Sequence, residues 1–499
     1  MAEGSIPSTP TTPLINKSHT LLEILICYHC IEMKKSFVSY IVAFNFLLSN
    51  FFWFILFLQF RLNVPTHPYL GLDSLWKKTT PDTHFITFII FLLTTFYVIN
   101  YFLITKYNIK KSWIKIFLVT SCISIFLNIL TFPFVSLDMF NYLMYLKMFY
   151  HFGANPYTTI PALFLPDQLI ERGFIHELHL FYGPGWLFAS FPQSFFSNFQ
   201  NADQTILIHK IASAFYIAGT SFFIYRMTEE KHQWIGMYFF LGNPLILFEG
   251  IVNGHSDGLL ALLLIISLYL ALKKSLFSLP VFIVALFTKY FLIAVLPLFL
   301  VLQYKNTKSL PKMFASITIA MLTLFLLFAP LWSHGKIIEG MLGSVISSQE
   351  SFYNASLYSM FRELIDIGVL HIPQNIALSF CIAIFSFIFL FIFRNWLKKT
   401  DHPETAMGNI LLVFFCILSL FYPWYIIPVF ALFCIRPNTE KIEFLLLFTI
   451  SGFGYYFVPL VIFYHFQFNI FISHCLQASI LGAPVVWYFS RVFKKFPRS

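Results

Sequence analysis

Runs of about 20 apolar residues recur along this chain from Phe37 to Phe493, and no long polar linker separates them. One α-helix needs a run of that length to cross the hydrocarbon core of a bilayer. The composition agrees, because 58% of the 499 residues are apolar and only 11% are charged, which excludes a water-soluble globular domain. Since a spanning helix satisfies its own backbone hydrogen bonds, we predict an all-α polytopic membrane protein with one integral-membrane unit.

The predicted single spans lie near residues 37–60, 85–105, 116–135, 205–226, 234–253, 258–272, 313–332, 373–393, 442–463 and 470–490. Two longer apolar runs are interrupted by polar residues. Lys289 divides the run 276–304, and Tyr422-Pro423-Trp424-Tyr425 divides the run 407–435. Each run is long enough for a hairpin of two short half-spans. With both hairpins, the chain is predicted to cross the membrane about 14 times.

The basic residues predict which side of the membrane each loop faces. Lys and Arg gather between alternate spans, as in Lys110-Lys111 and Lys273-Lys274, and such segments are cytoplasmic by the positive-inside rule. We expect the protein to lie in the inner (plasma) membrane with both termini in the cytoplasm. Residues 1–36 are predicted to be a flexible tail, and residues 37–499 the membrane unit. The net charge of +10 fits this topology and anionic lipids better than nucleic acid. The predicted outer loops are 61–84, 136–204 and 333–372.

Several polar clusters return to the predicted outer surface. The longest outer loop opens with a helical pattern in which Asp138, Tyr142 and Tyr145 share one face. We interpret this stripe as a polar constellation rather than a core face, and we expect short interfacial helices in this loop to cover a cleft. The other clusters are Tyr182-Gly183-Pro184-Gly185-Trp186, Asn253-Gly254-His255-Ser256-Asp257 and Tyr422-Pro423-Trp424-Tyr425.

A purely structural interpretation remains open for each cluster. Asp138 and Asp257 can cap the helices that they precede. Lys289 can extend from the end of its half-span to the membrane surface. The Tyr and Trp residues can belong to the aromatic belt at the lipid interface. His176 and His179 flank a carboxylate, but no third metal ligand is evident, so we expect no metal site there.

Taken in order, the motifs resemble a known family. They are D-x3-Y, G-x-N-P-Y, Y-G-P-x-W, N-P-L with N-G-H-x-D, a single Lys in an apolar hairpin, and P-W-Y. From about Ser136 to Pro428, this order is similar to the polyprenol-phosphate-mannose-dependent mannosyltransferases. The likeness is greatest to the bacterial α-1,6-mannosyltransferases that build lipomannan, within the GT-C superfamily of polytopic glycosyltransferases.

The resemblance implies a GT-C-like helical bundle and an inverting transfer of a hexose, with mannose the first choice. Asp138 matches the acidic residue that acts as the catalytic base in such enzymes. Two positions depart from the family pattern, since Leu137 stands where Arg is expected and Ser256 where Asn is common. These departures bear on the sugar and the acceptor more than on the reaction class.

The same chemistry can be argued from the residues. A sugar on a lipid phosphate is activated because the phosphate leaves as a stable anion, so the enzyme needs a base for the attacking hydroxyl and cations for the leaving oxygen. Asp138 is the predicted base. A lysine at the bilayer centre costs about 2.5–3.5 kcal/mol, so Lys289 is expected to reach a surface or an anion. The predicted donor-phosphate ligands are Lys289, His255, Lys210 and His209. The predicted sugar or acceptor ligands are Asp257, Tyr142, Tyr182, Trp186, Trp424 and Tyr425, with Glu249 a weaker candidate.

The predicted partners are a polyprenyl-phosphate-linked sugar, a glycan or glycolipid acceptor, and the lipid bilayer. The chain has no G-x-x-x-x-G-K-S/T or G-x-G-x-x-G motif, so we expect neither a nucleotide nor another cofactor. The alternative is a transporter or flippase of a lipid-linked saccharide, whose site is expected at the midplane between repeated halves. A lipid-linked-glycan polymerase or ligase is a third class, but the two largest outer loops contain only Arg172 and Arg362 as arginines.

Overall fold

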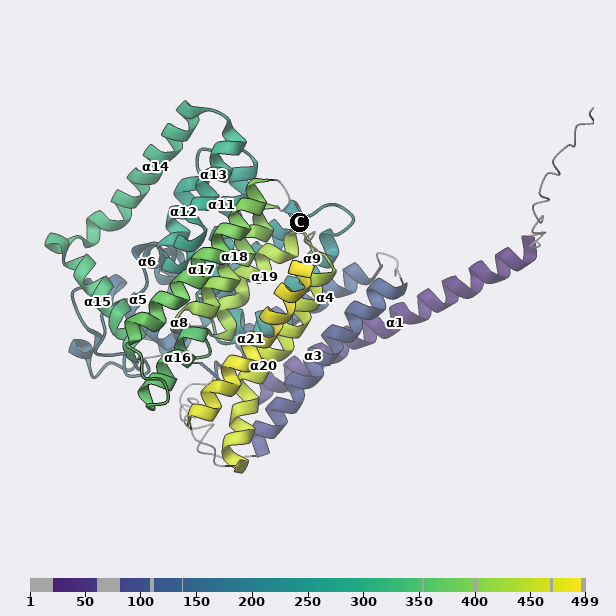
Figure 1. Ribbon diagram of the computed structural model, residues 1–499. Helices are drawn as coiled ribbons and strands as arrows, with labels where there is room; N and C mark the ends of the chain where they lie inside the picture. The colour runs from purple at the N-terminus through teal and green to yellow at the C-terminus, as the bar shows by residue number, and fades with distance from the viewer. Residues whose placement is uncertain are drawn as a thin grey trace, which may run out of the picture.

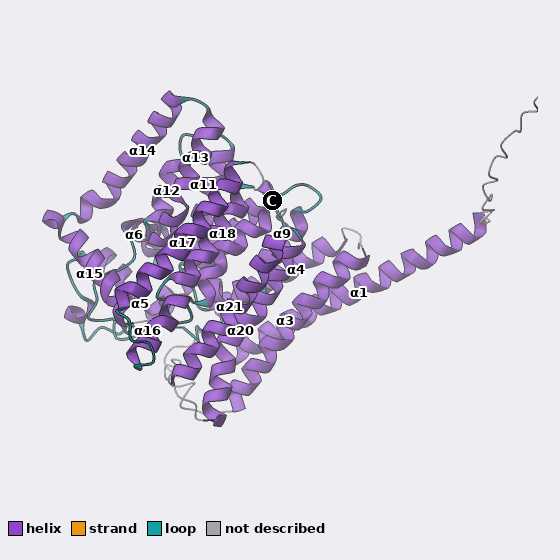
Figure 2. Ribbon diagram, in the orientation of Figure 1, coloured by secondary structure: helices purple, strands orange, loops and turns teal. Residues whose placement is uncertain are grey.

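The computed structural model describes residues 21–60, 81–107, 112–136, 138–351, 354–398, 402–466 and 470–494 (Figure 1). Helices and the loops between them make up these residues (Figure 2), apart from one isolated bridge between Asn354 and Leu420. The predicted all-α class is therefore confirmed for this part of the chain. Of the predicted tail, residues 1–20 lie outside the described residues, and residues 21–36 are helical and continue into the first span.

The long helices are α1 (Leu21–Gln59), α3 (Pro81–Tyr107), α4 (Ser112–Leu130), α8 (Ala202–Met227), α14 (Leu310–Phe328), α17 (Gln374–Leu397), α20 (Thr439–Phe466) and α21 (Ile470–Lys494). Shorter apolar helices lie among them: α9 (Gln233–Leu241), α10 (Pro244–Leu247), α11 (Asp257–Leu272), α12 (Ser278–Leu286), α13 (Leu296–Thr307), α18 (Pro403–Ile417) and α19 (Ile427–Ile435).

Seven helices of the described residues are long and apolar enough to cross a membrane, or eight if one bent pair is a single span. The pair comprises α9 and the segment Pro244–Val252, which meet at an angle of 50°. The bend follows from Asn243-Pro244, because the proline has no N–H to donate and the Asn243 side chain accepts from the N–H groups of Leu245 and Ile246. The predicted count of about 14 crossings is not confirmed.

The two predicted breaks lie where the polar residues interrupt the apolar runs. Helix α12 ends at Leu286, and a 3₁₀ turn η3 (Tyr290–Val295) follows Lys289 before α13. Helix α18 ends at Ile417, and a second 3₁₀ turn η6 (Pro423–Ile426) precedes α19. Both hairpins are therefore divided as the sequence predicts.

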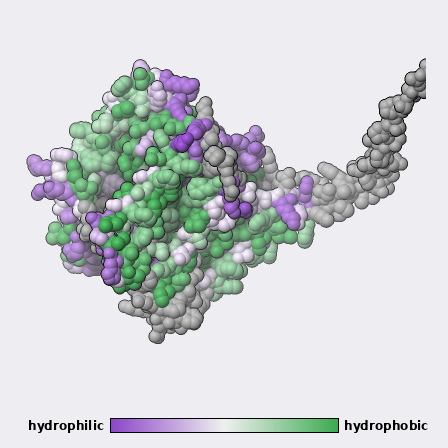
Figure 3. All heavy atoms as spheres, in the orientation of Figure 1, coloured by the Kyte–Doolittle hydropathy of each residue, from purple (hydrophilic) through white to green (hydrophobic). Residues whose placement is uncertain are grey.

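The outer surface of the bundle is apolar. Figure 3 shows hydrophobic residues over much of the viewed face, with hydrophilic residues gathered mainly at its edges. Large side chains such as Phe314, Phe325 and Phe387 are well over half exposed. Phenylalanine at this exposure is unfavourable in water and favourable against lipid, which supports a membrane location.

The longest predicted outer loop is a folded unit with a core of its own. It contains α5 (Asp138–Tyr150), the 3₁₀ turn η1 (Pro161–Phe164), α6 (Pro184–Ala189) and α7 (Phe191–Phe196). Their apolar side chains form a hydrophobic cluster separate from that of the helical bundle. The expectation of short helices in this loop is thus confirmed, and loop 333–372 likewise contains α15 (Lys336–Ser351) and α16 (Leu357–Asp366).

One interpretation of this loop is wrong. The stripe of Tyr142 and Tyr145 on α5 was expected to be a polar surface, but both rings are fully buried in the cluster of the loop. The Tyr145 hydroxyl donates to the carbonyl of Leu178 at 2.8 Å. A phenol can lie in an apolar core when its hydroxyl finds a partner, as that of Tyr145 does, so Tyr145 also fits a core face.

Candidate active site

A cavity of about 450 Å³ lies between the folded loop and the two divided hairpins. Asp138 and Asn141 of α5 and Tyr182 line it from the loop, and Lys289 lines it from the first hairpin. The turn of the second hairpin contributes aromatic rings, and the remaining wall is largely apolar. The residues of this turn that line the cavity are Tyr422, Trp424 and Tyr425.

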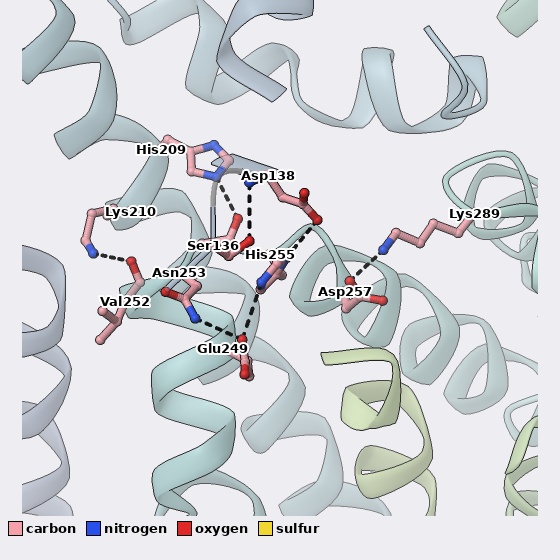
Figure 4. Close-up of polar contacts among 11 residues, drawn as sticks. Ser136, Asp138, His209, Lys210, Glu249, Val252, Asn253, His255, Asp257 and Lys289 are labelled. Carbon is pink, nitrogen blue, oxygen red and sulfur yellow. Dashed lines mark hydrogen bonds and ion pairs between the residues drawn. The ribbon is translucent and has the colours of Figure 1, made fainter. Parts of the chain in front are cut away.

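Asp138 lies at the edge of this cavity as the first residue of α5. Its backbone N–H donates to Ser136 Oγ at 3.3 Å, and its carboxylate Oδ2 lies 3.5 Å from Nδ1 of His255. The side chain is 22% exposed, enough to contact both water and a ligand in the cavity. The carboxylate thus has a side-chain partner from another segment, and Figure 4 shows its second oxygen pointing away from His255.

His255 is fully buried between two carboxylates. Its Nδ1 faces Asp138, and its Nε2 lies 3.3 Å from Oε2 of Glu249 (Figure 4). The indole of Trp424 stacks on the imidazole at a centroid distance of 3.9 Å. Burial alone would lower the pKa of His255, but the two carboxylates outweigh it and raise the pKa to about 8. The raised pKa favours the protonated, positively charged ring at neutral pH.

Lys289 forms the second charged pair of the site. Its Nζ donates to Oδ2 of Asp257 at 2.6 Å and lies 5.1 Å and 5.7 Å from the ring centroids of Tyr425 and Tyr182. Lys289 is only 7% exposed, so it does not extend to the membrane surface. Asp257 is the first residue of α11, and its Oδ1 has no hydrogen-bond partner among the described residues. Asp257 and His255 do not line the cavity and instead contact the side chains that do.

Two predicted phosphate ligands lie elsewhere. Lys210 is fully buried on α8, and its Nζ donates to the carbonyls of Thr131 and Val252 at 2.5 Å and 2.8 Å. His209 Nε2 lies 2.9 Å from the carbonyl oxygen of Gly254. Neither side chain lines the cavity. Their role is structural, because they bind backbone carbonyls of Val252 and Gly254, which precede His255 in the chain.

The predicted aromatic ligands divide into two groups. Tyr182, Trp424 and Tyr425 line the cavity, whereas Tyr142 and Trp186 are buried behind Tyr182, with ring centroids 5.3 Å from it in both cases. Tyr182, Trp186 and Trp424 are each less than 9% exposed. Side chains buried within the protein cannot form a belt against lipid, so the belt interpretation is wrong for these three.

The Tyr182-Gly183-Pro184-Gly185-Trp186 motif fixes the loop against the first hairpin. A Cβ on Gly183 would overlap the carbonyl oxygen of Phe287, and one on Gly185 would overlap that of Val284. The backbone N–H of Trp186 also donates to the Phe287 carbonyl at 3.2 Å. Phe287 lies two residues before Lys289, so the two glycines set how closely Tyr182 approaches this lysine.

Replacing Gly183 by Ala is expected to destabilise the protein by about 1–3 kcal/mol, since the added methyl group must displace the Phe287 backbone. A shift of this segment moves Lys289, so activity is expected to fall by about 10²-fold. Thermal unfolding in detergent and turnover would be measured together. Gly343→Ala is the matched control, because a Cβ there meets nothing within 4 Å. Equal behaviour of the two variants would contradict this role of Gly183.

Sequence reasoning missed two polar residues of the cavity, Asn141 and Tyr290, and underrated Glu249, which lies near it. Asn141 lies three residues after Asp138 on α5, a spacing that places both on one helix face, and its Oδ1 accepts from the Phe174 N–H at 3.1 Å. Tyr290 directly follows Lys289 and also lines the cavity. Glu249 was only a weaker candidate, yet it contacts His255. His176 Nε2 lies 2.7 Å from the Ile170 carbonyl, and His179 lines a different pocket.

Comparison with known proteins gives one match. None of the curated proteins is significantly similar to the chain. Residues 65–305 match the family model described as alpha-(1->6)-mannopyranosyltransferase, N-terminal domain. The matched range contains the four charged residues of the site, Asp138, His255, Asp257 and Lys289. The resemblance seen in the motifs is therefore confirmed: over residues 65–305 this chain is similar to the alpha-(1->6)-mannopyranosyltransferases, a family of glycosyltransferases whose name indicates mannosyltransferase activity.

Proposed function

We propose that this protein transfers mannose from a polyprenyl-phosphate donor to a hydroxyl group of a glycan or glycolipid, with inversion at the sugar carbon. The observation that carries the proposal is that Asp138 and Lys289 line the same cavity, one as a carboxylate and the other as a cation. A base and a cation are the two groups that this displacement requires. The largely apolar remainder of the wall suits the first isoprene units of the donor.

In the proposed reaction, the acceptor hydroxyl attacks C1 of the sugar while Asp138 takes the hydroxyl proton. The bond between C1 and the phosphate oxygen breaks, and its electron pair stays on the phosphate. Lys289 faces that oxygen and stabilises the charge that develops there. A single displacement inverts the configuration at C1, and no covalent sugar intermediate forms.

The aromatic rings of the cavity have a role beside the charges. Tyr182 and Tyr425 line the cavity together with Asp138 and Lys289, whereas the Trp424 indole is stacked between His255 and Tyr422. The C–H face of a hexose packs well on such rings, which would orient C1 between the base and the cation. The positive-inside rule favours an extracytoplasmic site in the plasma membrane, with both termini in the cytoplasm.

The test is a transfer assay with the purified protein in lipid. Labelled polyprenyl-phosphate mannose, glucose or arabinose is supplied with a mannan-type acceptor, and GDP-mannose serves as a control donor. Transfer from the mannosyl lipid alone supports the proposal. Transfer from GDP-mannose would overturn the donor assignment, and passage of the lipid-linked sugar across vesicles without product would favour a transporter.

We also expect transfer to be independent of metal ions, because Lys289 supplies at the cavity the positive charge that a divalent ion provides in other enzymes. Initial rates with and without excess EDTA should agree within about twofold. A large loss that Mg²⁺ or Mn²⁺ restores would contradict this assignment. The reaction with GDP-mannose as the only donor gives the background rate.

A further inference from the structure

Glu249 is a buried carboxylate for which the proposed reaction has no role. It lies in a π-helical turn η2 (Phe248–Val252) between α10 and α11, and it is fully buried. Its Oε2 accepts a hydrogen bond from Asn253 Nδ2 at 3.0 Å and lies 3.3 Å from His255 Nε2. Single π-helical turns often occur at functional sites, where they change the direction of one side chain. Here the turn directs Glu249 at His255.

The arrangement of oxygens around His255 determines the charge of its ring. Both ring nitrogens face carboxylate oxygens, Nδ1 that of Asp138 and Nε2 that of Glu249. A neutral imidazole has only one N–H and would place its other lone pair against a carboxylate oxygen, which is repulsive. An imidazolium donates from both nitrogens. Glu249 Oε2 also accepts from Asn253 Nδ2 at 3.0 Å, so this oxygen is a hydrogen-bond acceptor on both sides.

We propose that Glu249 is a positioning residue of the active site, which holds His255 as an imidazolium with its Nδ1–H directed at Asp138. The inference rests on the proposed function, because it assigns Asp138 as the base that His255 orients. With one Asp138 oxygen held by His255, the other is free to take the proton of the acceptor hydroxyl. The stacked Trp424 restricts the imidazole to one plane, and Glu249 fixes its rotation within that plane.

Other titratable groups surround this pair. Within the described residues, the groups that interact electrostatically with His255 or its two carboxylates include His209 on α8, Asp257 on α11, Tyr142 on α5, Tyr455 and Tyr456 on α20, and the cavity residues Tyr182, Tyr422 and Tyr425. Asp257 is already paired with Lys289 at 2.6 Å, and His209 bonds to the Gly254 carbonyl. Among the described residues, Asp138 and Glu249 supply the carboxylate oxygens that lie within 4.0 Å of the His255 ring nitrogens. They are therefore the groups that set the protonation of His255.

The first experiment reads the His255 ring directly and does not depend on activity. Protein labelled with ¹⁵N-histidine is titrated in detergent, and the His255 signal is identified by its loss in His255→Gln. In the wild type, the ring should be doubly protonated at pH 7 and should titrate near pH 8. In Glu249→Gln, the titration should move down by about 1–3 pH units, since one of the two neighbouring charges is lost.

The second experiment reads the pH profile of transfer. The imidazolium is present below its pKa and is lost as the pH rises through about 8, so wild-type activity should fall there. Glu249→Gln should move this alkaline limb to lower pH, and Glu249→Asp should restore part of the shift. The matched control is Glu363→Gln, which breaks a partly buried pair with His474 Nδ1 at 2.8 Å, and neither residue lines the cavity. It should leave the profile unchanged.

The outcomes separate this inference from the proposed function. A neutral His255 ring in the wild type at pH 7 overturns the role of Glu249 even if Glu249→Gln fails to fold. An unmoved titration or an unmoved alkaline limb in a folded Glu249→Gln overturns it as well. If the wild type transfers no sugar from any polyprenyl-phosphate donor, the proposed function fails, whereas the histidine titration still decides whether Glu249 controls His255.

Discussion

Replacing Asp138 by Asn is expected to lower the turnover of mannosyl transfer by about 10²–10⁴-fold. The asparagine keeps the size of the side chain, and its amide oxygen can still accept from His255 Nδ1, which lies 3.5 Å from the carboxylate in the wild type. It cannot take a proton from the acceptor hydroxyl. The loss should therefore appear in kcat, with KM for the donor changed little.

The matched control for this variant is Asp167→Asn. Asp167 lies in the same folded loop, is 20% exposed and pairs with Lys147 at 2.6 Å, but it does not line the cavity. This variant removes a carboxylate of similar exposure without touching the proposed chemistry, so its turnover should stay within a few-fold of the wild type. If Asp138→Asn is as active as this control, Asp138 is not the base.

Replacing Lys289 by Met is expected to affect both stability and turnover. The change leaves the fully buried Asp257 carboxylate without its cation, which costs about 3–5 kcal/mol in comparable buried pairs. It also removes the charge that stabilises the leaving phosphate, so turnover of the folded fraction should fall by about 10²–10³-fold. Thermal unfolding in detergent and single-turnover transfer measure the two effects.

The double variant Asp257→Asn with Lys289→Met separates these effects. Removing both charges leaves no unpaired ion, so the melting temperature should recover most of its loss while transfer stays low. Lys147→Met is the control, because this lysine is also buried and paired at 2.6 Å but does not line the cavity. It should lose stability and keep its turnover per folded molecule. Recovery of transfer in the double variant would remove Lys289 from the mechanism.

The helices could be predicted from the sequence because the hydrogen bonds of a helix close within a few residues. A run of apolar residues long enough to span lipid is therefore visible in the sequence itself, as is its interruption at Lys289 or at Tyr422 to Tyr425. The bend before Pro244 was not predicted, although Asn-Pro is a signal for it. The crossing count was not confirmed, since half-spans and interfacial helices have similar composition.

The site was predicted less completely. Asp138, Lys289, Tyr182, Trp424 and Tyr425 line one cavity, as the order of the motifs indicates. Other polar residues were placed in the site by the same kind of pattern and lie outside the cavity. They are Lys210, His209, Tyr142 and Trp186, together with His255 and Asp257, which contact the lining residues Asp138 and Lys289.

Composition and the spacing of polar breaks determine that this chain is a helical membrane protein with a carboxylate after its third span and a lysine within a hairpin. Tertiary structure decides which lysine is available to a ligand. Lys210 and Lys289 are both single lysines among mainly apolar neighbours, but one bonds to backbone carbonyls and the other pairs with Asp257 at the cavity wall. The physical reason is that a buried charge takes whichever partner the packing of distant segments brings within about 3 Å, and sequence spacing does not encode that distance.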